Sequence, residues 1–152
     1  MVLTEKETTI IDDLRQQEQS CIEKYRRYSR EAKDPVLQDL FTELGSKEQE
    51  HYDSLGQILS GKVPSCNCND RDGAQYQPKA TYSSMTNSED KKNDCFLATD
   101  CIGTEKMVSG TYNTDVFVFG DTKIRKLLAD IQVEEQNHAE MLYKYKTVNG
   151  MA

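Results

Sequence analysis

The residues best suited to chemistry are two copies of the motif Glu-x-x-His. Glu48 stands three residues before His51, and Glu135 stands three residues before His138. Residues three apart lie on the same face of an α-helix, so each motif presents a carboxylate beside an imidazole. Both groups are ligands for Fe, Mn and Zn. The chain has only two histidines and both lie in this motif, so the pattern predicts a metal site.

An internal repeat adds two further glutamates to these motifs. Residues that are 87 positions apart match along the chain, which pairs the two Glu-x-x-His motifs and also pairs Glu18 with Glu105. Apolar residues match at the same offset, as Leu55 does with Leu142. A repeat of this kind predicts two helical hairpins of one plan, related by an approximate twofold axis.

Four helices are expected to position these side chains. Apolar residues recur at steps of three, four or seven, and capping signals such as Asp34-Pro35 mark where helices begin. The expected helices span about 4–32, 34–59, 88–119 and 121–147. Residues 60–87 are rich in Ser, Asn, Asp, Gly and Pro and lack a helical period, which indicates a long loop. The predicted fold class is therefore all-α, a four-helix bundle of two antiparallel hairpins joined by a long crossover loop, with 1–152 as one domain.

The candidate ligands fall within the apolar stripes of these helices, where residues are expected to face the core. Glu18 and Glu48 are also equally distant from the first turn, so partners across each hairpin should lie at one height. Four buried carboxylates would repel one another, and two divalent cations would balance their four negative charges. The alternative is a degenerate site, stabilised by protonation, hydrogen bonds and water. The predicted metal ligands are Glu18, Glu48, His51, Glu105, Glu135 and His138.

Composition and charge exclude several other classes of protein. The chain is 36% hydrophobic and 30% charged, which is typical of amphipathic helices with a narrow apolar stripe. A net charge of -7 argues against nucleic acid or an anionic membrane as partner. The N-terminal residues lack the features of a signal peptide, and no apolar run reaches the roughly 20 residues of a membrane span. We therefore expect a soluble protein that is not secreted.

The cysteines do not suggest a disulfide framework, because their number is odd and their spacing irregular. Cys21 and Cys101 fall where small core residues are expected. The loop pair Cys66 and Cys68 could bind a soft metal or form cross-links, but a C-x-C pattern is a weak signal. The five cysteines are Cys21, Cys66, Cys68, Cys95 and Cys101.

The set of ligands on paired helices resembles the ferritin-like superfamily, which includes bacterioferritin and rubrerythrin. This resemblance covers both predicted hairpins. It also implies that Tyr25, seven residues after Glu18, lies near the metals and takes part in the chemistry without being a ligand. The alternative for Tyr25, and for Tyr112, is packing in the core. The ligands that the resemblance implies are terminal at Glu18 and His51 for one metal, terminal at Glu105 and His138 for the other, and bridging at Glu48 and Glu135.

The second half of the chain resembles another family, the coat F domain of spore-coat-related proteins, over TEKMVSGTYNTDVF and EEQNHAEMLYKYKTVNG. Two functions follow from the two resemblances. The first is a di-metal oxidoreductase, with two iron ions as the first choice and Mn or Zn as alternatives, that reacts with dioxygen or peroxide in the cytoplasm. The second is a structural protein of the spore coat whose metal is structural or vestigial. The macromolecular partners we expect are a second copy of the chain or spore coat proteins.

Overall fold

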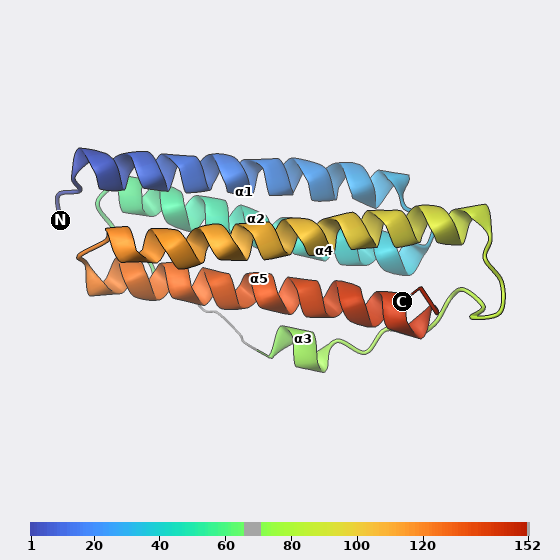
Figure 1. Ribbon diagram of the computed structural model, residues 1–152. Coiled ribbons are helices and arrows are strands. Elements are labelled where there is room, and N and C mark those ends of the chain that lie inside the picture. The colour runs from blue at the N-terminus through green and yellow to red at the C-terminus, as the bar shows by residue number, and fades with distance from the viewer. Residues whose placement is uncertain (66–70, 152) are drawn as a thin grey trace.

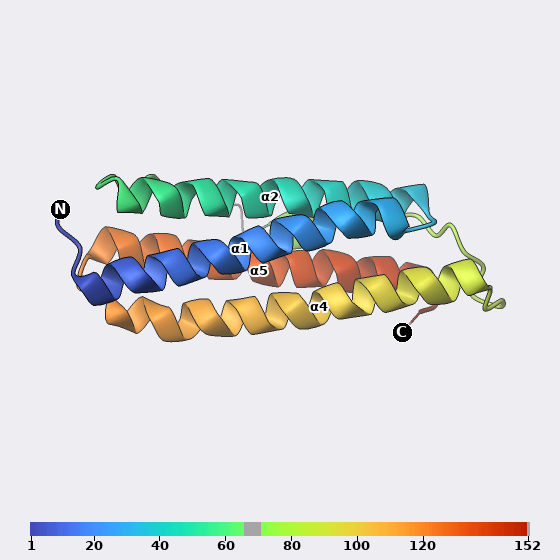
Figure 2. The same ribbon diagram turned by 90° about the horizontal axis from the view of Figure 1, so that it is seen from above.

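The structure, a computed structural model, describes residues 1–65 and 71–151, and these residues form helices and connecting segments without a strand. The all-helical prediction is confirmed. Four long helices lie side by side in both views of the molecule (Figures 1 and 2). They are α1 (Glu5–Glu31), α2 (Pro35–Leu59), α4 (Glu89–Asp115) and α5 (Thr122–Val148). A short helix α3 (Asp72–Gln75) and a 3-10 turn η1 (Val116–Val118) complete the described elements.

Each long helix begins at a side chain that caps it. Thr4 forms a capping box with Glu7, and Asp34 accepts a hydrogen bond from the Val36 N–H at 3.0 Å. Such caps satisfy backbone N–H groups that have no partner inside the helix. The four N-cap residues are Thr4, Asp34, Ser88 and Asp121.

The predicted position of the C-terminal end of the third long helix was wrong. The prediction ran to residue 119, whereas α4 ends at Asp115 and the chain continues as the tighter turn η1. The β-branched residues Val116 and Val118 have low helix propensity. Phe119 then adopts an extended backbone conformation and is only 3% exposed, so that this turn buries its ring in the core.

The chain between α2 and α4 returns along the molecule, as Figure 1 shows, so that these two helices point in the same direction. Helix α3 lies in this segment, where the sequence predicted only a loop, because four residues are too few to show a helical period. It packs on α5: the Gly73 N–H donates to Asn137 Oδ1 at 2.9 Å, and Lys144 Nζ donates to the Gly73 carbonyl at 2.6 Å. A Cβ at Gly73 would lie 2.8 Å from Asn137 Oδ1, so a larger residue here would displace the acceptor of the Gly73 N–H.

A buried polar network joins the crossover to the turn between α1 and α2. Asp94 is fully buried and accepts hydrogen bonds from the backbone N–H groups of Lys33 and Asp34, each at 2.9 Å. The hydroxyl of Tyr82, in the crossover, donates to the same carboxylate at 2.7 Å. Asp34 in turn accepts from the hydroxyl of Tyr145 on α5, also at 2.7 Å. This network therefore ties both hairpins and the crossover together at one end.

Two apolar clusters fill the interior, and the predicted ligands lie between them. Along α2, Leu44 belongs to one cluster and Leu55 to the other, with Glu48 and His51 between these residues. Cys21 and Cys101 are buried, as the sequence predicted. Cys66 and Cys68 lie outside the described residues. Within 1–65 and 71–151, no helix is long and apolar enough to cross a membrane.

Candidate metal centre

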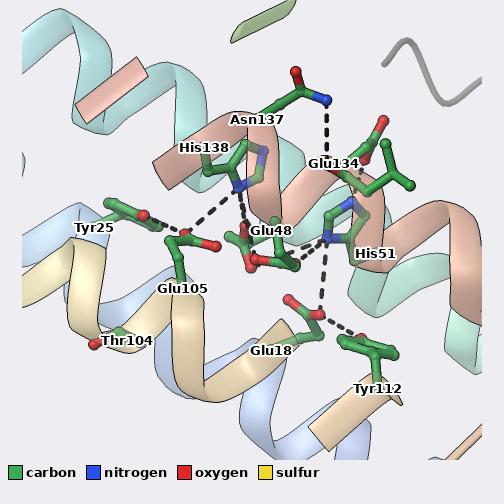
Figure 3. Close-up of polar contacts among 12 residues, drawn as sticks. Glu18, Tyr25, Glu48, His51, Thr104, Glu105, Tyr112, Glu134, Asn137 and His138 are labelled. Atoms are coloured by element: carbon green, nitrogen blue, oxygen red, sulfur yellow. Dashed lines mark hydrogen bonds and ion pairs between the residues drawn. The ribbon is translucent and has the colours of Figure 1, made fainter. Parts of the chain in front are cut away.

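The four long helices bring six ionisable side chains together in the interior (Figure 3). Helix α1 contributes one of them, α2 two, α4 one and α5 two. Each of the six residues is at most 3% exposed, although carboxylates and imidazoles are strongly hydrated when they have no partner. The six are the residues that the sequence singled out: Glu18, Glu48, His51, Glu105, Glu135 and His138.

The six side chains form two overlapping groups of four that could each hold a metal ion. Within a group, one ligand atom from each residue lies within 4.8 Å of the others. Glu48 and Glu135 belong to both groups, which is the arrangement that a carboxylate must have to bridge two metals. The first group is Glu18, Glu48, His51 and Glu135, and the second is Glu48, Glu105, Glu135 and His138.

Each histidine turns its Nδ1 atom toward carboxylates of both hairpins. His51 Nδ1 lies 3.0 Å from an oxygen of Glu135 and 3.7 Å from one of Glu18. His138 Nδ1 lies 2.7 Å from an oxygen of Glu48 and 3.5 Å from one of Glu105. The two imidazole rings are stacked, with centroids 6.0 Å apart. The Nδ1 atoms are thus the nitrogens that face the carboxylate cluster.

The donor set fits metal ions because its inner atoms lack hydrogen-bond partners. Among the described residues, both histidine Nδ1 atoms and both oxygens of Glu48 and Glu135 are buried without a hydrogen bond. One carboxylate oxygen of Glu18 and one of Glu105 are also buried without a hydrogen bond. Some of these atoms lie close to one another, but their geometry is not that of hydrogen bonds. Leaving buried polar atoms unpaired costs about 1–3 kcal/mol each, and divalent cations coordinated between them would remove that cost.

Two tyrosines connect the outer carboxylates of the site to the opposite hairpin. The hydroxyl of Tyr25, on α1, donates to Glu105 on α4. The hydroxyl of Tyr112, on α4, donates to Glu18 on α1. Tyr25 therefore contacts a predicted ligand, and Tyr112, its counterpart in the sequence repeat, makes the matching contact. Both hydroxyls orient a carboxylate whose remaining oxygen is left without a hydrogen bond.

Sequence reasoning missed one residue of the site, Glu134. Its carboxylate contacts Nε2 of His51, the ring nitrogen that faces away from the cluster (Figure 3). Glu134 lies directly before Glu135, which places it about a quarter turn away from the ligand face of α5. The sequence holds only a weak signal for it, a second glutamate beside the motif. Its partner on α2 depends on how the helices pack.

Burial and the close packing of the charged groups shift the pKa of several members of the cluster. Burial, followed by repulsion from Glu135, raises the pKa of Glu48 and of Glu105 well above the usual range. Burial alone would lower the pKa of His51, but its contacts with Glu134, Glu135 and Glu18 outweigh this and raise it. Burial would raise the pKa of Glu135, yet its close contacts with Glu105 and both histidines lower it. Positive charge is therefore favoured inside the cluster.

Comparison with known proteins gives one match. Residues 93–152 are similar to the Coat F domain, which confirms the resemblance of the second half of the chain to that domain. The matched stretch includes three of the six candidate ligands, Glu105, Glu135 and His138. No curated protein and no solved structure matches the chain. The comparisons give no support for membership of the ferritin-like superfamily.

Proposed function

We propose that this chain is a spore-coat-related protein whose helices hold a dinuclear metal centre. The Coat F match over 93–152 supports the first part of this proposal. The observation that carries the second part is the buried layer of six ligands with unpaired inner atoms. The proposed arrangement is a ferritin-like four-helix bundle, in which Glu48 and Glu135 bridge the two ions.

The ligand set favours two divalent ions with mixed oxygen and nitrogen coordination. Four carboxylates would cancel the charge of two such ions, and each neutral imidazole would add one nitrogen ligand. Fe and Mn suit this set, and Zn suits it with less selectivity. Among these, iron is the first choice. The terminal ligands would be Glu18 and His51 for one ion, and Glu105 and His138 for the other.

A structural role for the metals follows from where the ligands come from. Helices within one hairpin contact each other far more extensively than helices from different hairpins do. The ligand layer draws on all four long helices, so that bound ions would hold the two hairpins together. Metal binding would therefore stabilise the folded chain, as any ligand that binds only the folded state does. A rigid, metal-stabilised unit suits assembly with spore coat proteins, which are the partners we propose.

Consumption of dioxygen or peroxide is the second candidate function. The observation that favours it is the pair of shared carboxylates, because bridging ligands hold two metals close enough to act on one molecule. A pair of Fe(II) ions supplies two electrons to an oxidant when bound in such a site. The chain's own part would be to orient the terminal carboxylates through Tyr25 and Tyr112, and to exclude water through the surrounding apolar clusters.

Elemental analysis of the full chain purified from its native host tests the metal centre. We expect about two metal ions per chain, and a strong decrease in the variant Glu48→Gln, which keeps the shape of the side chain. Glu43→Gln, an exposed glutamate on the same helix, is the matched control and should keep both ions. A parent protein without metal would overturn the proposed centre.

Two further measurements separate the candidate functions. Absence of the chain from purified spore coat extracts would contradict the coat assignment. Spectra of the Fe(II)-loaded protein recorded during exposure to air or peroxide test the oxidant-consuming function. Rapid oxidation that is lost in Glu48→Gln supports this function, whereas no change on exposure rejects it and leaves the structural role.

A further inference from the structure

We infer that the two metal positions are unequal, because Glu134 positions one histidine ligand and no equivalent residue positions the other. This inference rests on the proposed dinuclear centre. It assigns tighter binding and earlier filling to the position that contains Glu18 and His51. The position that contains Glu105 and His138 would fill second.

The contact between Glu134 and His51 joins the two hairpins. Glu134 reaches from α5 to Nε2 of His51 on α2, and it is only 6% exposed. Nδ1 of the same ring points to Glu135 and Glu18, toward the cluster. An imidazole that binds a metal through Nδ1 carries its hydrogen on Nε2, and this N–H can donate to the carboxylate of Glu134. The contact therefore fixes both the tautomer and the orientation that metal binding requires.

The repeat breaks at the residue that would serve the second histidine. Glu134 lies four residues before His138, and the matching position, four residues before His51, is Lys47. Lysine has three donors and no acceptor, so it cannot accept the hydrogen of an imidazole. Its amino group instead lies 3.6 Å from Glu50 Oε2, at the surface of α2. In the part of the chain that the structure describes, no carboxylate contacts Nε2 of His138.

The energetic effect of this difference is substantial in other metal sites. Removing a partner that orients a ligating histidine lowers metal affinity or activity by about 10- to 100-fold. The first position has this partner and the second lacks it, while the other ligand types are the same. We therefore expect the two positions to differ in affinity by about 10-fold or more.

Titration of the metal-depleted full chain with Co(II) tests the inference. Calorimetry and visible absorption measure the binding at each step of the titration. The parent should bind two ions in separate steps. Glu134→Gln should weaken the first step by about 10-fold or more and leave the second nearly unchanged. Lys47→Glu supplies the missing carboxylate and should strengthen the second step, which a loss of fold could not do. Glu43→Gln is the control and should match the parent.

Proton spectra of the Co(II)-loaded protein give a readout that does not depend on affinity. The parent should show one imidazole N–H signal that exchanges slowly with water, from His51. This signal should be lost in Glu134→Gln, and a second one should appear in Lys47→Glu. Two steps of equal affinity, or an equal loss in both steps in Glu134→Gln, would overturn the inference and leave the proposed centre standing. A parent that binds no Co(II) would overturn both.

Discussion

Two turns of the molecule, α1–α2 and α4–α5, each contain an aspartate, but the surroundings of the two aspartates differ. Each turn ends in an aspartate that caps the next helix, Asp34 in the first hairpin and Asp121 in the second. Asp34 is 4% exposed and accepts hydrogen bonds from Tyr145 and Thr81 as well as from its own helix. Asp121 accepts from the backbone of its own helix.

This difference has a simple origin in the path of the chain. The crossover residue Tyr82 donates to Asp94 of α4, which accepts from the backbone of the first turn. Among the described residues, Asp121 at the second turn accepts from the backbone of its own helix. The six candidate ligands therefore match between the hairpins, whereas the surroundings of the two capping aspartates differ, as do Glu134 and its counterpart Lys47.

The largest expected effect comes from variants that act on both hairpins at once. Glu48→Ala or Glu135→Ala should lower the metal content toward zero, because each carboxylate belongs to both ligand groups. His51→Ala and His138→Ala should each weaken mainly one ion. Metal stoichiometry of the purified variants, measured by elemental analysis, checks this. If Glu48→Ala kept both ions, the bridging assignment would be wrong.

Removing the metals should destabilise the protein and reverse its response to pH. Two independent ions at 100 times their dissociation constants would each add about 2.7 kcal/mol to the free energy of unfolding. In the metal-free chain, Glu48 and Glu105 have a pKa raised above the usual 4.5, mainly by burial. The pKa of both histidines is raised above 6.5: burial lowers it, but the surrounding carboxylates outweigh that.

A raised folded-state pKa stabilises the fold below the unfolded pKa, and this contribution is lost as the pH rises through the folded value. The metal-free protein should therefore melt at a lower temperature at about pH 8 than at about pH 5. Glu135 has a lowered pKa, and its contribution is lost only at more acidic pH. The metal-loaded protein should show the opposite trend over this range, because ligands must lose protons to bind metal. Melting curves that rise with pH in the metal-free form would contradict this account.

The two capping aspartates give a direct test of the difference between the turns. Asp34→Ala removes a helix cap and leaves the buried hydroxyl of Tyr145 without its acceptor, so we expect a loss of about 3 kcal/mol. Asp121→Ala removes a cap alone and should cost about 1 kcal/mol. Urea unfolding of the metal-free variants measures both values. Equal losses would show that the network at the first turn does not stabilise the fold.

Effects smaller than that of Asp34→Ala are expected from the two tyrosines, whose hydrogen bonds match between the hairpins. Tyr25→Phe and Tyr112→Phe each remove one hydrogen bond to a buried carboxylate and should each cost about 1–2 kcal/mol. The two losses should be nearly equal in urea unfolding of the metal-free protein. A clear difference between them would mean that the two hydrogen bonds are not equivalent.

The sequence predicted the long helices and the inward orientation of the six candidate side chains well, because both depend on local periodicity. The spacing of Leu44, Glu48, His51 and Leu55 places all four side chains on one face of a helix, whatever that helix packs against. Helix α3 was missed because its four residues carry no period, and it packs through the backbone of Gly73 on α5. The end of α4 was misplaced because burial of Phe119, a tertiary effect, decides it.

The sequence by itself determined which residues face inward and that two sets of three ligands match. The tertiary structure decided which residues from different helices meet. Glu134 and His51 are 83 residues apart, and their contact depends on the rotation of α5 about its axis and on its height relative to α2. Thr81 and Tyr82 of the crossover likewise hydrogen-bond to the network at the first turn, although both aspartates cap their helices. Periodicity is a property of each helix alone, whereas these contacts depend on the packing of several helices at once.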